Sequence, residues 1–331
     1  MAIKKFRQSR KHSVFITNKN VLTFSLVDYR NNYFTSDDTN KIIEFYNGFD
    51  NRDQLIKWMK ERPKGVANIY EVDGDKDIIV VIPTADFNGK YAKECRENIF
   101  RGLHIIFVES GEIPDPYFNY SHNCNVGIRK AMEYNPKWIV VSNDDVVVEE
   151  ISNLILLLRT LKGNYYVPKN TYSNLYGQVF NVSASIFFLY SIYKLFKNGF
   201  GQFKFNIRIL TNKIFSKDLT LISSCEGIIY RILSYCAKPI SLPYRNFADF
   251  GIFNSDIFKA NKFDERFING YEDGEFCNRL AKNNITGEVI DFEAHSRDGG
   301  GNSFGKGDSI NRIARDFGNL LMLSYIFKEI N

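Results

Sequence analysis

Continuous apolar runs alternate with amphipathic segments between residues 77 and 161. Three runs are apolar at nearly every position, and they lie at 78–82, 103–108 and 138–141. Such runs predict strands that are buried on both faces of a sheet. Segments with helical spacing separate or follow them, near 90–100, 126–134 and 149–161. This alternation predicts parallel strands joined by crossover helices, and therefore an α/β fold.

The second half of the chain continues the alternation in a less regular way. We expect extended chain at 249–253, a short helix capped by Asn254, a turn at 263–267, a helix from Glu272 to about 283, and a strand at 287–292. An amphipathic pattern predicts a last helix near 310–330. Upstream, residues 1–76 show two short strand patterns, at 13–16 and 21–24, and a helix that Asn51 can cap.

These patterns divide the chain into three regions. Residues 1–76 form a small N-terminal accessory region, residues 77–309 the main domain, and residues 310–331 a C-terminal helix. Within the main domain, residues of about 170–245 do not follow the strand–helix alternation, apart from a strand expected at 219–222. We interpret them as an insert.

Composition agrees with a folded chain that has a sizeable core, since 44% of its residues are hydrophobic and 24% are charged. The net charge is +5, and no pattern of interleaved basic and aromatic residues suggests nucleic acid as a partner. Five scattered cysteines without a CxxC pair fit reduced thiols. We therefore expect a cytoplasmic location.

Two features bear on membranes. The first twelve residues carry five basic residues and no acid, which suits either anionic lipid or a solvated terminus. The apolar segment 182–196 is shorter than the roughly 20 residues that span a bilayer. It fits a partly buried helix and a helix lying on a membrane surface equally well. Peripheral contact with the inner face of the membrane is thus an open alternative.

Polar residues follow each of the three apolar runs. Thr84 comes after the first, Glu109 ends the second, and Asn143-Asp144-Asp145 follows the third. Because ligands of parallel α/β sheets bind beyond the carboxyl ends of the strands, these residues are candidates for one site. Adjacent carboxylates such as Asp144 and Asp145 are costly to bury without a cation, and hard oxygen ligands favour Mg²⁺ or Mn²⁺. A solvated turn explains the pair equally well.

Further candidates lie nearer the C-terminus. Glu272 and Asp273 open a helix, where the helix dipole stabilises anions by roughly 0.3–1 kcal/mol without any catalytic role. His295 follows a strand and is either a metal ligand or a structural histidine. A glycine-rich loop at 298–307 is either a linker or a cover for a phosphate, with Arg297 or Lys306 as its cation. His104 lies within an apolar run and is expected to be structural.

In their order along the chain, these segments resemble the inverting nucleotide-sugar transferases of glycosyltransferase family 2, which have a GT-A fold. The resemblance covers residues 77 to about 300. It rests on the following segments: Val80–Thr84, Phe107–Gly111, Asn125-Val126-Gly127, Val141–Asp145, Phe263–Phe267, Tyr271-Glu272-Asp273, Cys277–Leu280 and His295. Two departures are Asn143, the first position of an aspartate triplet, and Glu109, where the family usually has Asp.

The resemblance implies a mostly parallel mixed sheet flanked by helices and a role for each matching residue. Asp273 would be the catalytic base, Asp145 and His295 would bind Mn²⁺ or Mg²⁺, and Glu272 and Asp249 would lie on the acceptor side. The residues expected to bind the nucleotide-sugar are Pro83, Thr84, Glu109, Asn125, Asn143 and Asp144. The implied partners are a nucleotide-diphosphate sugar donor and a glycan, lipid or protein acceptor.

Two other functions remain as alternatives. A nucleotidyltransferase of the same fold would usually carry a glycine-rich basic loop after the first strand, whereas residues 85–90 contain one Gly and one Lys. A catalytically inactive module that binds nucleotide-sugars would explain Asn143 as decay, although Asp145, Asp273 and His295 are all retained.

Overall fold

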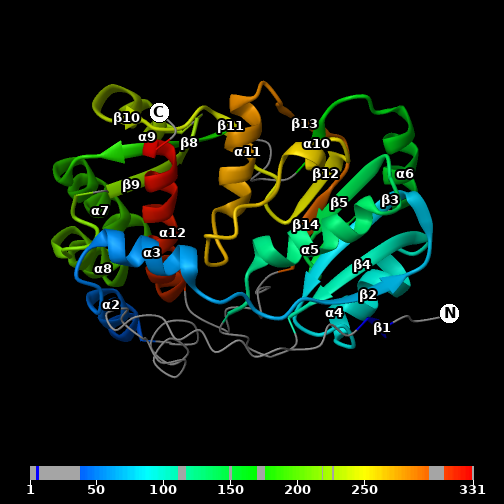
Figure 1. Cartoon of the computed structure of the whole chain (residues 1–331). Helices are drawn as coiled ribbons and strands as arrows, with labels where there is room; N and C mark the ends of the chain where they lie inside the picture. The colour runs from blue at the N-terminus through cyan, green and yellow to red at the C-terminus, as the bar shows by residue number, and fades with distance from the viewer. Residues whose placement is uncertain are drawn as a thin grey trace.

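An eight-stranded mixed sheet forms the larger part of the molecule (Figure 1). The computed structural model describes residues 5–6, 38–110, 117–148, 151–169, 176–217, 219–225, 227–297 and 309–329. In spatial order the strands are β1 (Lys5–Phe6), β2 (Asn68–Val72), β4 (Leu103–Glu109), β3 (Asp75–Thr84), β5 (Trp138–Ser142), β12 (Phe250–Asn254), β7 (Tyr165–Pro168) and β13 (Gly287–Ile290). The expected α/β class is confirmed.

The centre of this sheet is parallel and buried on both faces. Strand β3 pairs in parallel with β4 and with β5, as the apolar runs predicted. Alternate residues of β3 enter two separate cores: Ile79 and Val81 belong to one, and Val80 and Ile82 to the other. Among the eight described strands of this sheet, β2 and β12 run antiparallel to the other six, so most strands share one direction.

Helices cover both faces of the sheet. On one face lie α5 (Tyr120–Met132), α10 (Ile257–Ala260) and α11 (Glu272–Lys282). On the other lie α4 (Lys90–Glu94), its π-helical continuation η2 (Cys95–Ile99), and α6 (Ile151–Thr160). Helix α5 approaches β3 and β4 closely at Gly127, where an added Cβ would lie 2.5 Å from a methyl group of Val81. The glycine of the Asn-x-Gly segment is thus required by helix–sheet packing.

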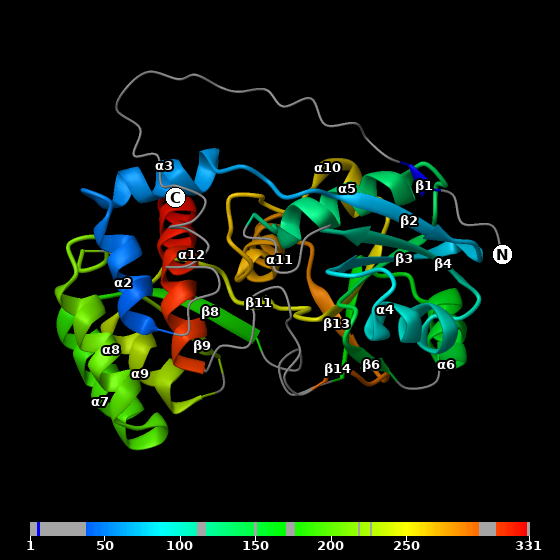
Figure 2. The same cartoon turned by 90° about the horizontal axis from the view of Figure 1, so that it is seen from below.

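A second, smaller part combines the insert with the two ends of the described chain. In the insert, β8 (Tyr176–Val182) pairs antiparallel with β9 (Leu219–Ser224), β10 (Lys238–Pro239) and β11 (Tyr244–Arg245). Its helices are α7 (Ala184–Asn198), α8 (Phe200–Thr211) and α9 (Ile228–Cys236). Helix α12 (Ser309–Glu329) packs against α8 and β9 and against the N-terminal helices α2 (Thr39–Asn47) and α3 (Arg52–Glu61), which lie beside it in Figure 2.

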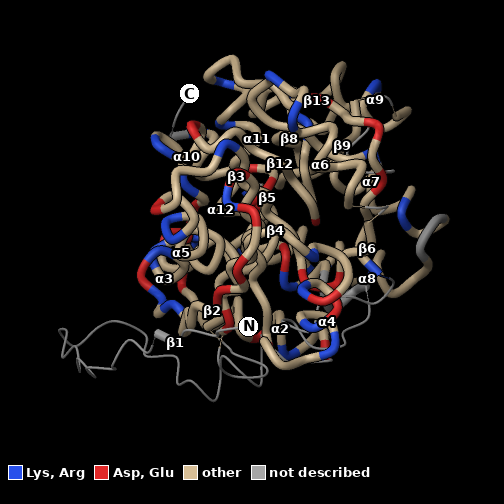
Figure 3. Tube along the Cα trace, turned by 90° about the vertical axis from the view of Figure 1, so that its right-hand side faces the viewer, with Lys and Arg blue, Asp and Glu red and all other residues tan. Residues whose placement is uncertain are grey.

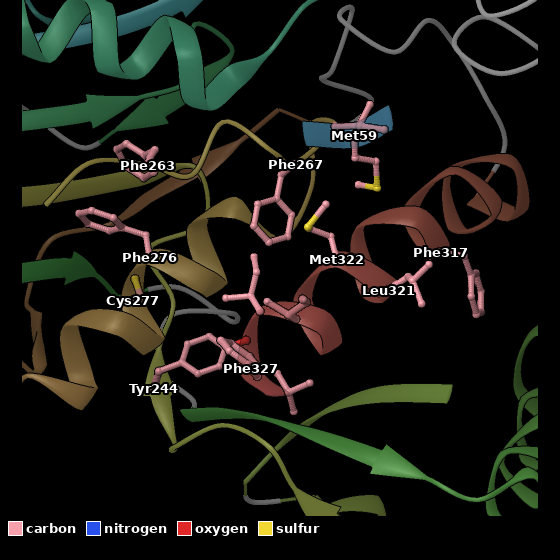
Figure 4. Close-up of a cluster of buried hydrophobic side chains, with 14 of the residues drawn as sticks. Met59, Tyr244, Phe263, Phe267, Phe276, Cys277, Phe317, Leu321, Met322 and Phe327 are labelled. Atoms are coloured by element: carbon pink, nitrogen blue, oxygen red, sulfur yellow. The ribbon is translucent and has the colours of Figure 1, made fainter. Parts of the chain in front are cut away.

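One continuous apolar core joins the two parts (Figure 4). Met59 of α3, Met322 and Phe327 of α12, and Phe276 of α11 all belong to it. The turn at 263–267 contributes Phe263 and Phe267, both almost fully buried. This turn is therefore anchored in the interior of the molecule.

The structure differs from the sequence expectations in two places. Strand β2 belongs to the region assigned as accessory, yet it joins the main sheet antiparallel to β4, between β4 and β1. Asn51 caps α3 as expected, but Asn254 lies before the short helix, which begins at Ile257. The strands expected at 13–16 and 21–24 lie outside the described residues. None of the described helices is both long and apolar enough to cross a bilayer.

Tyr46 links α2 to α12 by hydrogen bonds to the backbone of α12. Its buried hydroxyl donates to the carbonyls of Arg315 (2.8 Å) and Ala314 (3.1 Å), and it accepts the N–H of Gly318 (3.0 Å). Removing it would delete buried hydrogen bonds that join the two helices.

We therefore expect Tyr46→Phe to lower the free energy of unfolding by about 1–3 kcal/mol, measured by urea denaturation. The matched control is Tyr235→Phe, because Tyr235 is 94% exposed. Equal stability of both variants and the wild type would show that the hydroxyl does not stabilise this contact.

Candidate functional site

The ends of β3 and β4 lie side by side at one edge of the large sheet. Thr84 is the register partner of Glu109, and Pro83 is that of Val108. The N–H of Ser110 donates to the Thr84 carbonyl at 3.1 Å, which continues the pairing past the last strand residues. The two segments that the sequence placed at strand ends are therefore neighbours.

Glu109 organises an aromatic pair beside the strand ends. Its carboxylate accepts the backbone N–H of Phe87 at 2.9 Å and the hydroxyl of Tyr70 at 3.3 Å. The two rings stack, with centroids 4.4 Å apart and an angle of 5° between their planes. The Arg96 guanidinium lies 4.6 Å from the centroid of the Phe87 ring and donates to the Phe87 carbonyl. The loop after β3 is thus held by a carboxylate, a stacked ring and a cation.

Asp144 points toward the end of β3. The Thr84 hydroxyl donates to its carboxylate at 2.6 Å, and the Cys95 thiol donates to its backbone carbonyl at 3.2 Å. Burial raises the pKa of Asp144, while the bond from Thr84 opposes that shift. Burial, together with Asp144, also holds the pKa of the Cys95 thiol far above its usual value, so the thiol remains a donor. These contacts fix the position of the aspartate pair.

Asp145 is buried in a negatively charged environment. It is 5% exposed, and burial together with Asp144 and Asp249 raises its pKa to about 6. Arg297 opposes this shift, and its backbone N–H donates to the Asp145 carbonyl at 3.0 Å. A buried carboxylate that is destabilised by its neighbours is suited to a cation.

His295 lies on an exposed position of a two-stranded ladder that follows the aspartates in the sequence. Strand β14 (Ala294–Ser296) pairs antiparallel with β6 (Val146–Val148), so that His295 faces Val147, two residues after Asp145. Among the described residues, no group of three His, Cys, Asp or Glu side chains is arranged to hold a metal. A cation at Asp145 would therefore need further ligands from a substrate, as Mg²⁺ and Mn²⁺ often take from phosphates.

Asn143 joins β5 to β12 at the site. Its backbone N–H donates to the Asp249 carbonyl and its side-chain amide donates to the Asp249 carboxylate, both at 3.0 Å. An aspartate at position 143 would bring a second carboxylate against Asp249, whereas the amide supplies a hydrogen-bond donor. The departure from an aspartate triplet thus has a structural reason in this chain.

Asp273 is held in a fixed orientation at the start of α11. One carboxylate oxygen accepts the amide of Asn246 at 2.8 Å, and the other accepts the N–H of Gly274 at 2.8 Å. Burial raises its pKa, and Asp249 adds to the shift by charge repulsion. The charge of Asp249 therefore raises the pKa of both Asp145, the metal candidate, and Asp273, the candidate base.

Glu272 has a different setting from its neighbour. Its carboxylate accepts the N–H of Gly270 at 2.5 Å, and the side chain is buried against the core. Burial, followed by repulsion from Asp273, raises its pKa to about 8. The raised pKa favours the protonated form of Glu272 near neutral pH, and its carboxyl group orders the preceding turn.

Backbone strain flanks both acidic segments. Ala248, just before Asp249, has φ 51°, and Tyr271, just before Glu272, has φ 66°. Such values are uncommon for residues other than glycine and typically cost about 1–3 kcal/mol. The fold holds both residues in these conformations, which sets the direction of the carboxylates that follow.

Asn125 contacts the turn at 263–267. Its amide donates to the Phe263 carbonyl and to the Glu265 carboxylate, and its oxygen accepts the N–H of Phe263. His122 also contacts the Glu265 carboxylate at 3.1 Å, and mainly through this bond the pKa of Glu265 falls to about 2. Both amide hydrogens of Asn125 are engaged in these bonds. Asn125 therefore supports this turn, in place of the expected contact with the nucleotide-sugar.

Comparison with known proteins does not identify the chain. Neither models of protein families nor curated proteins match it.

Most of the expected site residues come together. Strand pairing, hydrogen bonds and electrostatic coupling link Thr84, Glu109, Asn143–Asp145, Asp249, Asp273 and His295 in one region. The glycine-rich loop, with Lys306, lies outside the described residues. Arg297 pairs with Glu94 and lies close enough to lower the pKa of Asp145. His104 is buried against Glu71, as a structural histidine should be.

Three residues at the site were not expected from the sequence. Tyr70 and Phe87 form the stacked pair at Glu109, and Asn246 orients Asp273. Tyr70 and Asn246 lie in stretches without a motif, and only tertiary folding brings them to the site. Phe87 gave a weak signal, because a bulky aromatic follows the Pro83-Thr84 strand end by three residues.

The pH dependence of stability should report the protonation of Glu272. Between the usual pKa of 4.5 and the folded value of about 8, the folded protein holds a proton that the unfolded chain has released. Stability therefore falls as the pH rises through this window. Glu272→Gln keeps the acceptor for Gly270 and has no proton to lose.

We expect the free energy of unfolding to fall less steeply between about pH 5 and about pH 8 in Glu272→Gln than in the wild type. Urea denaturation in the presence of a chelator measures it. Glu44→Gln, an exposed change on α2, should retain the wild-type slope. A wild-type slope in Glu272→Gln would mean that Glu272 is already ionised across this range.

Proposed function

We propose that this protein is an inverting glycosyltransferase that moves a sugar from a nucleotide-diphosphate donor to an acceptor hydroxyl. The observation that carries the proposal is that residues 246–249 contact both sides: Asn246 donates to Asp273 at 2.8 Å, and Asp249 accepts the amide of Asn143, two residues before Asp145, at 3.0 Å. A carboxylate suited to a metal–diphosphate and a carboxylate suited to a general base therefore belong to one site, as a transfer reaction requires.

The architecture agrees with the GT-A fold that the resemblance to glycosyltransferase family 2 implies. Six of the eight described strands of the large sheet share one direction, and helices flank both faces. The candidate residues lie at the carboxyl ends of β3, β4 and β5, where open α/β sheets bind ligands. Fold alone does not define an activity, so the proposal rests on the site.

The donor side would be formed by the strand ends. Glu109 is engaged by Phe87 and Tyr70, so it fixes the stacked rings beside the position where a nucleotide base would lie. Thr84 holds Asp144 at the strand ends, where Asp144 and Asn143 would meet the donor diphosphate and ribose. Asp145 is the residue that would bind the cation, with His295 beside it on β14.

A bound Mn²⁺ or Mg²⁺ supplies charge neutralisation for the diphosphate as it leaves. The contribution of Asp145 is a buried carboxylate that already faces excess negative charge, so that cation binding removes an unfavourable interaction. Arg297 adds a positive charge on the same side.

Asp273 would act as the general base. Asn246 and the N–H of Gly274 orient its carboxylate, and burial raises its basicity. It takes the proton of the acceptor hydroxyl while that oxygen forms a bond to the anomeric carbon. The bond from this carbon to the diphosphate oxygen breaks on the opposite face, so the configuration inverts and nucleoside diphosphate departs.

Donor binding should depend on metal and on Asp145. In a thermal-shift screen of nucleoside diphosphates and nucleotide-sugars, we expect stabilisation by one nucleotide family only when Mn²⁺ is present. A ligand at 100 times its dissociation constant stabilises a fold by about 2.7 kcal/mol.

Asp145→Asn should abolish this shift, and Asp53→Asn, an exposed change on α3, should preserve it. Absence of any shift in the wild type would instead favour an inactive module. Pyrophosphate release from a nucleoside triphosphate would favour a nucleotidyltransferase.

Asp273→Asn should separate binding from turnover. We expect the variant to keep the donor-induced thermal shift and to lose roughly 10²–10⁴-fold in the rate of transfer, because proton removal contributes that much. The assay follows nucleoside diphosphate release from the donor that the screen identifies, with lipid, glycan and protein acceptors in parallel. Turnover close to that of the wild type would remove Asp273 from the role of base.

A further inference from the structure

Exposed apolar side chains gather on the insert. The described chain has eleven large hydrophobic residues that are markedly exposed, and nine of them lie between Phe188 and Leu242. The other two, Leu156 and Val289, lie apart on α6 and β13. Scattered apolar residues need no explanation, but such a concentration on one part of a fold marks an interaction surface.

The exposed residues follow helical spacing on two helices. On α7, Leu189, Tyr193 and Phe196 recur at intervals of four and three and form one outward stripe, while Phe187 and Ser191 face the core. On α9, Ile228, Ile232 and Tyr235 form an equivalent stripe, with exposed fractions of 70%, 53% and 94%. Each helix is therefore apolar on its buried side and again on its outer side.

Helix α8 extends the stripe of α7. The ring of Phe203 lies 6.5 Å from that of Phe188 and 6.2 Å from that of Phe200, so the three rings bridge the two helices. Figures 1 and 2 show α7, α8 and α9 together at the end of the molecule away from the large sheet. We refer to these exposed stripes of α7, α8 and α9 as the insert surface.

The insert also carries a net positive charge. Residues 183–240 hold eight Lys and Arg and two Asp and Glu, a net charge of +6, which leaves −1 for all other residues. Lys204 on α8, Arg231 on α9 and Lys238 on β10 are exposed. Around α3, α4 and α5, by contrast, basic and acidic positions are interspersed (Figure 3).

We propose that the insert surface docks the protein onto an anionic lipid bilayer. Apolar side chains on helices beside exposed lysines and arginines suit the boundary between acyl chains and negative headgroups. A second copy of the chain fits less well, because a symmetric contact would oppose two regions that each carry +6. The docking surface is separate from the transfer site and does not depend on the proposed reaction.

The test measures sedimentation of the full chain with vesicles of phosphatidylcholine alone and of phosphatidylcholine with phosphatidylglycerol. We expect binding to the anionic vesicles, weaker binding to the neutral ones, and a decline with added salt. Leu189→Glu and Tyr235→Glu should each lower partitioning about tenfold or more. Leu156→Glu, which changes a 62% exposed leucine on α6, should bind as the wild type does.

Two charge-reversal variants test the electrostatic part of the proposal. Lys204→Glu and Lys238→Glu should weaken binding to anionic vesicles and leave the weak binding to neutral vesicles unchanged. Thermal unfolding of each variant shows that its fold is intact. The proposal fails if the wild type ignores both vesicle types, or if Leu156→Glu and Leu189→Glu bind equally. It also fails if light scattering detects a concentration-dependent dimer that Leu189→Glu disrupts.

Discussion

The crowding of buried carboxylates at the site is the constraint on which the other features depend. Burial, and after it repulsion between neighbours, raises the pKa values of Asp145, Asp273 and Glu272: Asp249 acts on Asp145 and Asp273, and Asp273 acts on Glu272. Such an arrangement costs free energy and persists only when the surrounding fold determines it. Donors placed by the backbone limit this cost: Asn143 serves Asp249, Asn246 serves Asp273, and Gly270 serves Glu272. Asn143, which stands where an aspartate triplet would begin, thus helps to stabilise the carboxylate cluster.

The core explains how the fold keeps these side chains in place. The apolar cluster runs without interruption from the sheet through α11 to α12 and α3. Asp273 opens α11, whose Phe276, one turn along, stacks on Phe263 with centroids 4.4 Å apart. Movement of Asp273 would therefore disturb buried aromatic packing. The strained Tyr271 and Ala248 are held by the same packing, since a rigid interior transmits strain instead of relaxing it.

The sequence predicted those parts of the structure that depend on local periodicity. The runs ending at Thr84, Glu109 and Ser142 became the parallel centre of the sheet, because a strand buried on both faces leaves an unmistakable apolar pattern. Strand β2 was missed because Asn68–Val72 is short and only partly buried at an edge. Tyr70 and Asn246 could not be found, since their contacts join residues 39 and 27 positions apart and depend on the tertiary fold. Asn125 was misread because a motif does not state which partner an amide meets.

The insert shows where the periodicity of hydrophobic residues no longer predicts which side of a helix is buried. Residues 182–196 are apolar on nearly all sides, so the spacing of hydrophobic residues cannot say which side faces the core. The structure resolves this by burying Phe187 against Phe317 of α12 and leaving Leu189 and Phe196 outside. A helix that had only to pack on the core would carry polar residues on its outer stripe. The two interpretations that the sequence left open are therefore compatible: the helix is partly buried, and its other face remains available to a partner.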